Sequence, residues 1–273
     1  MSAEERDPIS FPPLSPSCLL SARRRLVGRR VVTVAEATST NDLAFEALAR
    51  EGEAASGAAF FAEEQTAGRG RLGRSWHARP GASILVSIAL RLPAAPAAPA
   101  LVAASAVAVR EAIATGGEAP RIKWPNDLLV GGRKVCGILL EARASAGRAD
   151  VALGIGVNVA GRPDLDGPPD LRSTATSLES AGSKLTRAAL ARRMLDRLDV
   201  RVSQALAGEL ADVEARFLEG LELAGRRVSV ELHGGARSLG VLASFSCARG
   251  VAIRADGDLR WHAAESVAHV AAR

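Results

Sequence analysis

The sequence predicts an α+β fold followed by a small all-β segment. Apolar residues recur at helical spacing in some stretches and form short β-like runs in others, and the two patterns are interspersed. Gly131-Gly132 separates two β-like runs and predicts a hairpin turn, a connection that regular βαβ units lack. After Gly225 only short β-like runs remain, which predicts a boundary near Glu222–Gly225. We therefore prefer an α+β fold to a doubly wound one.

The amino-terminal part of the chain, residues 1–30, is expected to be a lead-in. Residues 1 to about 16 are rich in proline and predict irregular structure. A short helix is expected around Cys18–Val27, and a strand at Val31–Ala35. A helix is expected next, because the apolar residues Leu43, Ala47 and Leu48 recur at helical spacing and Gly52 offers a stop at its carboxy-terminal end. Thr38–Asn41 is thus a strand-to-helix junction, where side chains lie near free N–H groups.

The middle of the chain alternates strands with helices. Strands are expected at Ala58–Glu63, Ala82–Leu92, Arg121–Trp124, Leu128–Val130, Lys134–Ala142 and Val151–Val159. Helices are expected at about Ala100–Thr115, Thr186–Gly208 and Glu209–Leu218, with loops at Pro93–Pro99 and Gly161–Pro169. The final β-like runs are Arg226–Leu232, Ser238–Phe245, Gly250–Ala255 and Asp258–Trp261. These patterns predict a main domain over residues 31–222 and an all-β domain over residues 223–273.

The composition is that of an ordinary globular protein. The 273 residues are 48% hydrophobic and 24% charged, with a formal net charge of +5, so the bulk of the chain is not disordered. No apolar run reaches the roughly 18 residues of a membrane span, and the acidic start is unlike a signal peptide. The cysteines Cys18, Cys136 and Cys247 are far apart and form no CxxC motif, which argues against a disulfide framework or a zinc site. A cytoplasmic location is expected.

The densest chemical signal is Gln65–Arg74, in which three glycines alternate with three arginines. Glycines let backbone N–H groups approach an anion, and guanidinium groups bind phosphate oxygens, so the segment is typical of a flexible cover over phosphates. A basic surface loop is the equally weighted alternative. Trp76, just after this segment, could stack on a ring or belong to the core.

Three further segments carry polar groups with two interpretations each. Lys123, flanked by Ile and Trp, could neutralise a carboxylate or an α-phosphate, while the Pro-Asn-Asp that follows the Trp is also ordinary turn chemistry. Ser39-Thr40-Asn41 could bind a small polar ring or simply cap a helix. Asn158, after the glycines of Gly154-Ile-Gly, could face a ligand or be a core residue with its hydrogen bonds satisfied.

Together these segments resemble one family, the biotin–protein ligases. The resemblance rests on the order Ser39-Thr-Asn, Gln65-Thr-Ala-Gly-Arg-Gly-Arg, Lys123-Trp-Pro-Asn-Asp, Gly137-Ile-Leu and Gly154-Ile-Gly-Val-Asn. It covers about Val31 to Asn158, and the carboxy-terminal β segment fits the SH3-like domain of that family. The resemblance implies a catalytic domain like that of class II aminoacyl-tRNA synthetases, with a mixed sheet and helices.

The implied reaction joins biotin to ATP as biotinyl-5′-AMP and then transfers biotin to a lysine of a carboxyl carrier protein. ATP and Mg²⁺ would be needed, with no metal site built by the protein itself. By motif match, the resemblance implies that biotin is contacted by Ser39, Thr40, Asn41 and Gln65, and that Arg69, Gly70 and Arg71 belong to the loop that closes over it. It implies that Lys123 holds the biotin carboxylate and the α-phosphate. Trp76 and Asn158 would lie near the nucleotide. Fixed cations and a closing loop suit a step that joins two anions, and that step needs no protein nucleophile.

The resemblance also bounds the partners. Bifunctional members carry an amino-terminal helix-turn-helix, and about 30 residues before the catalytic block leave no room for three helices. We therefore expect no nucleic-acid binding, no repressor activity and no membrane partner, with a homodimer left open. Two alternatives remain: a lipoate–protein ligase, which shares the fold and the chemistry, and a basic nucleic-acid-binding regulator, favoured only by the pI near 9.8 and the arginine content.

Overall fold

A seven-stranded sheet forms the centre of the computed structural model, which describes residues 12–93, 98–145, 147–163 and 174–273. Its strands are β1 (Val31–Ala37), β2 (Ala59–Gln65), β3 (Ser83–Leu92), β4 (Arg121–Lys123), β5 (Asp127–Val130), β6 (Arg133–Ser145) and β7 (Arg148–Asn158). They pair in the order β1-β2-β3-β7-β6-β5-β4. Only β1 and β2 run parallel; the other pairs are antiparallel. The predicted mixed sheet is confirmed, including the Gly131-Gly132 hairpin between β5 and β6.

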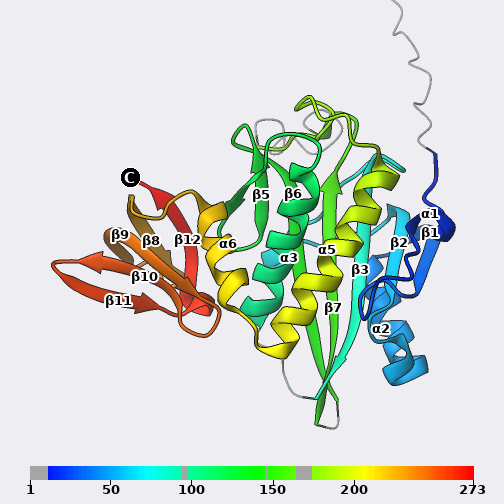
Figure 1. The fold of residues 1–273 in the computed structure, drawn as a ribbon, viewed down its shortest axis with the longest axis horizontal. Coiled ribbons are helices and arrows are strands. Elements are labelled where there is room, and N and C mark those ends of the chain that lie inside the picture. The colour runs from blue at the N-terminus through cyan, green and yellow to red at the C-terminus, as the bar shows by residue number, and fades with distance from the viewer. Residues whose placement is uncertain (1–11, 94–97, 146, 164–173) are drawn as a thin grey trace, which may run out of the picture.

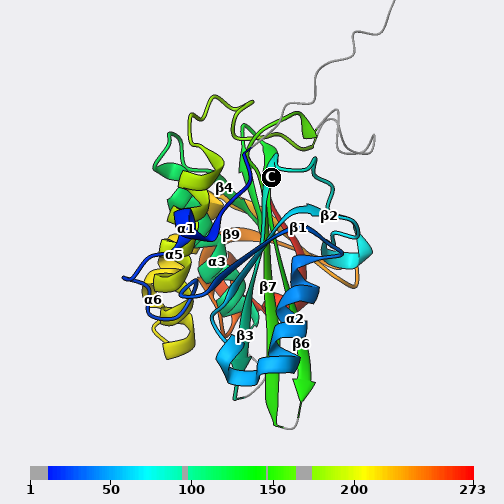
Figure 2. The same ribbon diagram turned by 90° about the vertical axis from the view of Figure 1, so that its right-hand side faces the viewer.

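Helices cover both faces of this sheet (Figures 1 and 2). On one face lie α3 (Ala98–Ala114), α5 (Arg187–Ala207) and α6 (Ala211–Leu221); on the other lies α2 (Thr40–Glu51). Strand β3 shows why both faces are covered: Ile88 belongs to the core under α3 and α5, and its neighbour Ala89 to the core under α2. Successive side chains of a strand point to opposite faces, so a strand between two helical layers is apolar throughout.

The helix ends follow local chemistry. Helix α2 begins after Ser39, whose hydroxyl accepts a hydrogen bond from the N–H of Asn41 at 3.3 Å. Helix α5 begins after Thr186, which accepts from the N–H of Ala189, and it ends at Gly208 with φ +77°. Glycine adopts this left-handed conformation without strain, which is why the helix stops there.

The amino-terminal segment differs from the expectation of a helix over Cys18–Val27. Only α1 (Pro16–Leu19) is helical, and residues 20–30 run as turns along α5. The Asp199 carboxylate of α5 accepts from the N–H groups of Arg25, Leu26 and Val27 at 2.8–2.9 Å. These contacts satisfy the donors that a helix would otherwise pair, so tertiary bonds replace the helix. Residues 1–11 of the expected lead-in lie outside the described residues.

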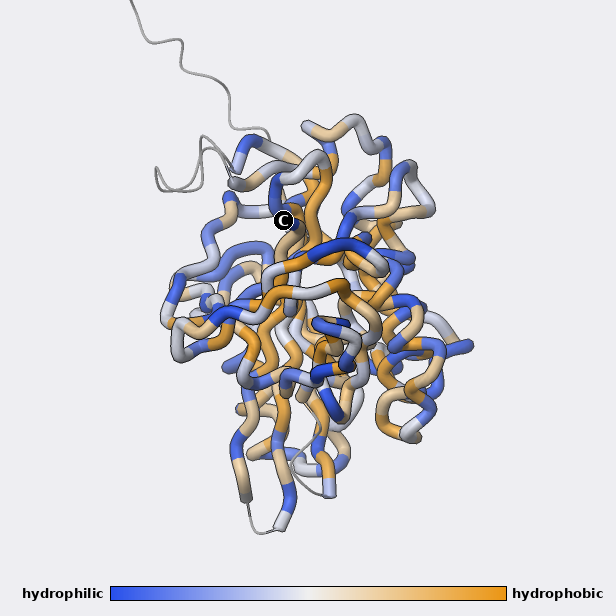
Figure 3. The backbone as a smooth tube through the Cα atoms, turned by 90° about the vertical axis from the view of Figure 1, so that its left-hand side faces the viewer, coloured by the Kyte–Doolittle hydropathy of each residue, from blue (hydrophilic) through white to orange (hydrophobic). Residues whose placement is uncertain are grey.

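A second, five-stranded antiparallel sheet follows α6. Its strands are β8 (Arg227–Leu232), β9 (Arg237–Ser246), β10 (Gly250–Ala255), β11 (Asp258–His262) and β12 (Val267–Ala272), in the order β11-β10-β9-β8-β12. The patterning predicted the first four, whereas β12 was not expected and pairs with β8. Viewed from the side of this sheet, apolar residues follow the interior strands and hydrophilic residues are frequent in the loops (Figure 3).

An aromatic cluster joins the two sheets. Trp124, at the end of β4, meets Phe217 of α6 and Phe245 of β9 edge-on, with ring centroids 6.1 and 5.8 Å apart. Its indole N–H donates to the carbonyl of Val267 in β12 at 3.0 Å. The expected loops at Pro93–Pro99 and Gly161–Pro169 fall partly or mostly outside the described residues. No helix in the described part of the chain is long and apolar enough to cross a membrane.

Candidate functional site

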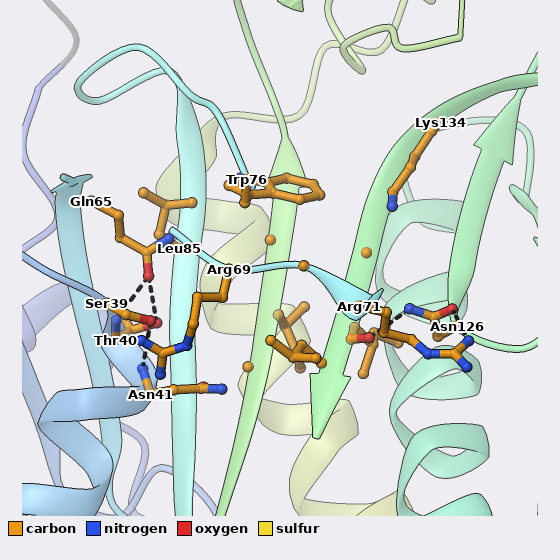
Figure 4. A pocket seen from close by; sticks show the side chains of 17 residues that line it. Ser39, Thr40, Asn41, Gln65, Arg69, Arg71, Trp76, Leu85, Asn126 and Lys134 are labelled. Carbon is orange, nitrogen blue, oxygen red and sulfur yellow. Dashed lines mark hydrogen bonds between the residues drawn. The ribbon is translucent and has the colours of Figure 1, made fainter. Parts of the chain in front are cut away.

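A pocket lies on the α2 face of the central sheet, at the amino-terminal end of α2 (Figure 4). It encloses about 50 Å³. Its wall residues are Ser39, Thr40, Asn41, Gln65, Arg69, Gly70, Arg71, Trp76, Leu85, Asn126, Lys134, Gly137, Ile138, Leu139, Gly154, Ile155 and Gly156. Eight of the ten residues that the sequence singled out are therefore together, while Lys123 and Asn158 are not in this wall.

The floor of the pocket requires glycine. A Cβ atom on Gly154 would lie 2.6 Å from Asn41 Oδ1, and one on Gly156 would lie 2.5 Å from Cε2 of Trp76. Both distances are too short for non-bonded atoms. The strand β7 therefore lets the α2 terminus and the Trp76 indole approach its backbone directly, as expected for glycines in a strand interior.

The wall beside α2 is a buried polar cluster. The Thr40 N–H and hydroxyl both donate to Oε1 of Gln65, at 2.8 and 3.1 Å. The Ser87 hydroxyl of β3 lies 2.7 Å from the Thr40 hydroxyl and 2.5 Å from Asn41 Oδ1. Ser39, Thr40 and Asn41 are all buried. The junction predicted from Thr38–Asn41 is thus both a helix cap and a set of fixed donors and acceptors; Ser87 was missed because its strand pattern is simply apolar.

The two loop arginines are held on opposite sides of the pocket (Figure 4). Arg69 lies on the α2 side, where its guanidinium donates to both oxygens of Asp42 and both oxygens of Glu141. Arg71 lies on the β4–β5 side and donates to Asn126 Oδ1 at 3.1 Å. Asn126 in turn donates to the carbonyl of Ile138 at 2.7 Å. The sequence reasoning singled out none of these three partners as site residues.

These contacts shift the pKa values of the acidic partners. Hydrogen bonds from Arg69 are the largest influence on Asp42 and hold the pKa of that carboxyl below its usual range. For Glu141, partial burial alone raises the pKa, but hydrogen bonds from Arg69 and Asn41 outweigh it and the net shift is downward. The same pairs raise the pKa of Arg69. Both carboxylates are therefore charged around the arginine at neutral pH.

The lysine in the pocket wall is Lys134, at the start of β6. Its ammonium lies 2.7 Å from Asp127 Oδ1 and 5.5 Å from the centre of the Trp76 ring. Its backbone pairs with the segment after β7, through the carbonyl of Thr174 and the N–H of Thr176. The sequence offered a hint of this lysine, because Lys134 stands three residues before Gly137, the first residue of the fourth segment that resembles the family.

Lys123, which the sequence reasoning placed in the site, lies on the edge strand β4. It faces Asp127 across the β4–β5 ladder, outside the residues that line the pocket. Burial, followed by the nearby charge of Lys123, lowers the pKa of His269 in the second sheet. The structure therefore places Lys134, and not Lys123, in the wall of this pocket.

Trp76 separates this pocket from a second, larger one. Its ring covers Gly156 and approaches Gly137, and its buried Nε1 has no hydrogen-bond partner among the described residues. The second pocket holds about 470 Å³, and Trp76 and Gln65 line both pockets. Asn158 lines the second pocket, where its amide donates to the carbonyl of Thr176 at 3.1 Å. Two adjoining pockets suit two ligands whose reacting groups meet at their common wall.

Comparisons with known proteins show which family the chain resembles. The Biotin/lipoate A/B protein ligase family matches residues 33–158. The biotin--[acetyl-CoA-carboxylase] ligase of Mycobacterium tuberculosis is 37% identical over 237 residues, covering 81% of this chain and 84% of that protein. The bifunctional ligase/repressor BirA of Bacillus spizizenii is 40% identical over 178 residues, covering 63% and 54% respectively, so the chain spans about half the length of that relative.

The fold also matches solved structures. The biotin protein ligase from Aquifex aeolicus, solved in complex with biotin and ATP, superimposes with a TM-score of 0.69 at 24% identity, covering 90% of this chain and all of that one. The likeness extends over the helices, the mixed sheet and the carboxy-terminal β region. The chain therefore belongs to the biotin/lipoate protein ligase family, and within it to the biotin–protein ligases.

Proposed function

We propose that this protein is a biotin–[acetyl-CoA-carboxylase] ligase that activates biotin with ATP and transfers it to a lysine of a biotin carboxyl carrier protein. One observation carries the proposal. A single glycine-floored pocket holds a buried set of hydrogen-bonding groups at one end, around Thr40 and Gln65, and two cations, Arg71 and Lys134, at the other. That order of groups suits a ligand with a polar ring, an apolar chain and a terminal carboxylate.

The polar end suits the ureido ring of biotin, which offers two N–H donors and one carbonyl acceptor. Ser39, Thr40, Asn41 and Gln65 present both donors and acceptors in fixed positions. The apolar middle, Leu85, Ile138 and Leu139, suits the ring carbons and the chain. A site whose buried polar groups match the ligand rejects analogues that leave those groups unpaired, so lipoate, which has no ureido group, should bind weakly.

The carboxylate end suits adenylation. One carboxylate oxygen attacks the α-phosphorus of ATP, a bond to the bridging oxygen breaks, and pyrophosphate leaves. Lys134 and Arg71 offset the repulsion between carboxylate and phosphate, because charges fixed in a water-poor pocket act more strongly than in solution. Asp127 holds the Lys134 ammonium in place. In the second step the acceptor lysine attacks the acyl carbon, AMP leaves, and the amine loses a proton.

The second pocket suits the nucleotide. Its volume of about 470 Å³ is in the range of small-molecule sites, and it meets the first pocket at Trp76. We place the adenosine there, with Asn158 and the Trp76 ring as neighbours. We propose that Mg²⁺ arrives with ATP as co-substrate, because it prefers phosphate oxygens and water to an all-protein cage.

The partner we propose is a carrier domain that presents its lysine at the mouth of the first pocket. The far half of β6, from Leu139, pairs with β7 on one side and extends beyond its ladder with β5. This open edge offers backbone groups to a carrier strand or to a second copy of the chain, and we keep a homodimer within the proposal. The thiols of Cys18, Cys136 and Cys247 are free, which suits the reducing cytoplasm.

The decisive experiment is ATP–pyrophosphate exchange with the purified protein and Mg²⁺, in the presence of biotin, lipoate or no acid. We expect exchange with biotin alone. Exchange with lipoate would instead identify the protein as a lipoate–protein ligase. If neither acid supports exchange, the catalytic proposal fails, and duplex-DNA binding with steep salt dependence would favour the regulator instead.

A further inference from the structure

The arginine that begins the loop over the pocket is fully occupied by two carboxylates. Arg69 Nη1 and Nη2 lie 3.0 and 2.8 Å from the two oxygens of Asp42. Its Nε and Nη2 lie 3.2 and 2.9 Å from the two oxygens of Glu141. All three guanidinium nitrogens are thus used in two bidentate contacts, the strongest geometry available to an arginine.

The two carboxylates come from separate, rigid elements. Asp42 is in the first turn of α2, where a negative charge is favoured by the helix dipole, and Glu141 is in the middle of β6. Glu141 also accepts from Asn41 Nδ2 at 2.6 Å, so the cluster continues into the polar end of the pocket. All three charged side chains are partly buried, with 27–35% of each exposed.

Arg69 therefore has no positive charge to spare for a substrate. One cation faces two anions, and the local sum of these three charges is −1. Among the described residues, Arg71 donates to the neutral Asn126, and Lys134 pairs with one carboxylate, that of Asp127. The cations that can meet an anionic ligand are Arg71 and Lys134, whereas Arg69 is bound in place.

The loop that Arg69 anchors forms part of the pocket wall, through Arg69, Gly70 and Arg71. Its two arms are joined by hydrogen bonds from Gly70 N–H to the Arg74 carbonyl and from Trp76 N–H to the Gly68 carbonyl. With the loop in this position the pocket holds about 50 Å³ of space, far below the roughly 300 Å³ at which small-molecule sites begin. A bicyclic acid can reach the polar end only when the loop moves outward, and this movement strains or breaks the contacts of Arg69.

We propose that Asp42 and Glu141 are positioning residues that latch the loop through Arg69, setting how often the pocket opens and how long an acyl-adenylate stays inside. The proposal rests on the proposed function only for the second of these effects. Opening of the loop is a property of the protein without any ligand. The two effects can therefore be measured separately.

The first measurement is limited trypsin digestion of the ligand-free protein, following cleavage after Arg71 by mass spectrometry. Asp42→Asn and Glu141→Gln keep the side-chain shape and leave the loop sequence unchanged. Each should raise the cleavage rate three- to fivefold, the size expected for losing one partly exposed ion pair. The double variant should exceed either single variant, and Asp42→Glu should return the rate towards that of the wild type.

Glu53→Gln is the matched control, because Glu53 pairs with Arg148 at 3.2 Å on the exposed surface, away from the loop. It should digest like the wild type. Thermal unfolding of each variant separates local opening from a general loss of stability. If cleavage after Arg71 is unchanged in both Asp42→Asn and Glu141→Gln, the latch does not exist. If the cleavage rate rises in Asp42→Asn and not in Glu141→Gln, the proposal is also overturned, since the loss of a negative charge from the first turn of α2 would then explain the change.

The second measurement is the dissociation rate of biotinyl-5′-AMP formed on the enzyme, read from labelling of a bystander protein that lacks the carrier sequence. The latch variants should release the adenylate three- to fivefold faster while biotin-dependent exchange at saturating biotin stays within twofold. A purely structural defect would lower exchange instead. Unchanged release overturns the role in retention, whereas absent exchange in the wild type would refute the proposed function and leave the digestion result valid.

Discussion

At the scale of single residues, the site depends on which of two lysines reaches the pocket. Lys123 and Lys134 both stand next to a turn in a β-rich part of the sequence, and both lie near Asp127. Lys123 faces Asp127 across the β4–β5 ladder, and Lys134 forms an ion pair with it. Only Lys134 lines the pocket. Because the effect of a charge on a reaction falls with distance, we expect the lysine in the pocket wall to contribute more than the lysine on the edge strand.

Replacing the two lysines separately tests this assignment. Lys134→Ala should lower biotin-dependent ATP–pyrophosphate exchange by about 10²-fold or more, because it removes a fixed charge from the reacting groups. Lys123→Ala should stay within about threefold of the wild type. The opposite pattern of rates would return Lys123 to the site and remove Lys134 from it.

A second prediction at this scale concerns Gly156. The added methyl group of Gly156→Ala would collide with the Trp76 ring, so the indole must leave its place between the two pockets. We expect biotin affinity, measured by calorimetry, to fall at least tenfold, with a shift in tryptophan fluorescence. Gly234→Ala is the control, because no atom lies within 4 Å of its added Cβ. Wild-type affinity in Gly156→Ala would show that Trp76 is not part of the biotin wall.

At the scale of elements, the amino-terminal segment is held by α5 and not by its own helix propensity. Asp199, 8% exposed, accepts three backbone N–H groups, and the buried Arg24 binds Asp196 and the carbonyls of Leu19 and Gly28. The sequence pattern could not reveal this, because Asp196 and Asp199 lie more than 170 positions from the groups that they bind in this segment. Strand β12 was missed for the same reason: its pairing with β8 defines it.

Asp199→Ala should therefore destabilise the protein by about 3 kcal/mol, since it leaves three N–H donors, one buried and two partly buried, without this acceptor. The measurement is the free energy of unfolding from a urea titration. Glu53→Ala, which removes an exposed ion pair, should cost about 0.5 kcal/mol or less. A cost for Asp199→Ala as small as that of Glu53→Ala would mean that water replaces the carboxylate and that the segment is not held by it.

At the scale of the whole molecule, Trp124 connects the second sheet to the first pocket. Its ring packs with Phe217 and Phe245, its N–H binds Val267, and two positions further along the chain Asn126 holds Arg71. The second sheet thereby supports the turn on which one wall of the pocket is built. That the chain divides into two domains at residue 222 stays a prediction. The contacts of Trp124 predict that these two parts depend on each other for stability.

Trp124→Phe and Trp124→Ala measure that dependence. The phenylalanine keeps most of the packing and leaves the Val267 carbonyl without its donor, which should cost about 1–2 kcal/mol of unfolding free energy. The alanine also removes the ring and should cost about 3–5 kcal/mol. We expect exchange activity to fall in the order of these losses, even below the unfolding temperature. Full activity in a folded Trp124→Ala protein would show that the second sheet does not position the pocket.

The sequence alone determined the fold class, the order and type of most elements, and the residues at the α2 terminus and in the glycine-arginine loop. These features depend on local chemistry, because residue periodicity, turn residues and the order of motifs can all be read from neighbouring positions in the sequence. Tertiary structure alone decided that Lys134 and not Lys123 faces the pocket, that Arg69 is held by Asp42 and Glu141, and that residues 20–30 follow α5. Each of these depends on which distant strands and helices become neighbours, and on whether a charge meets an opposite charge, which no spacing within a segment can specify.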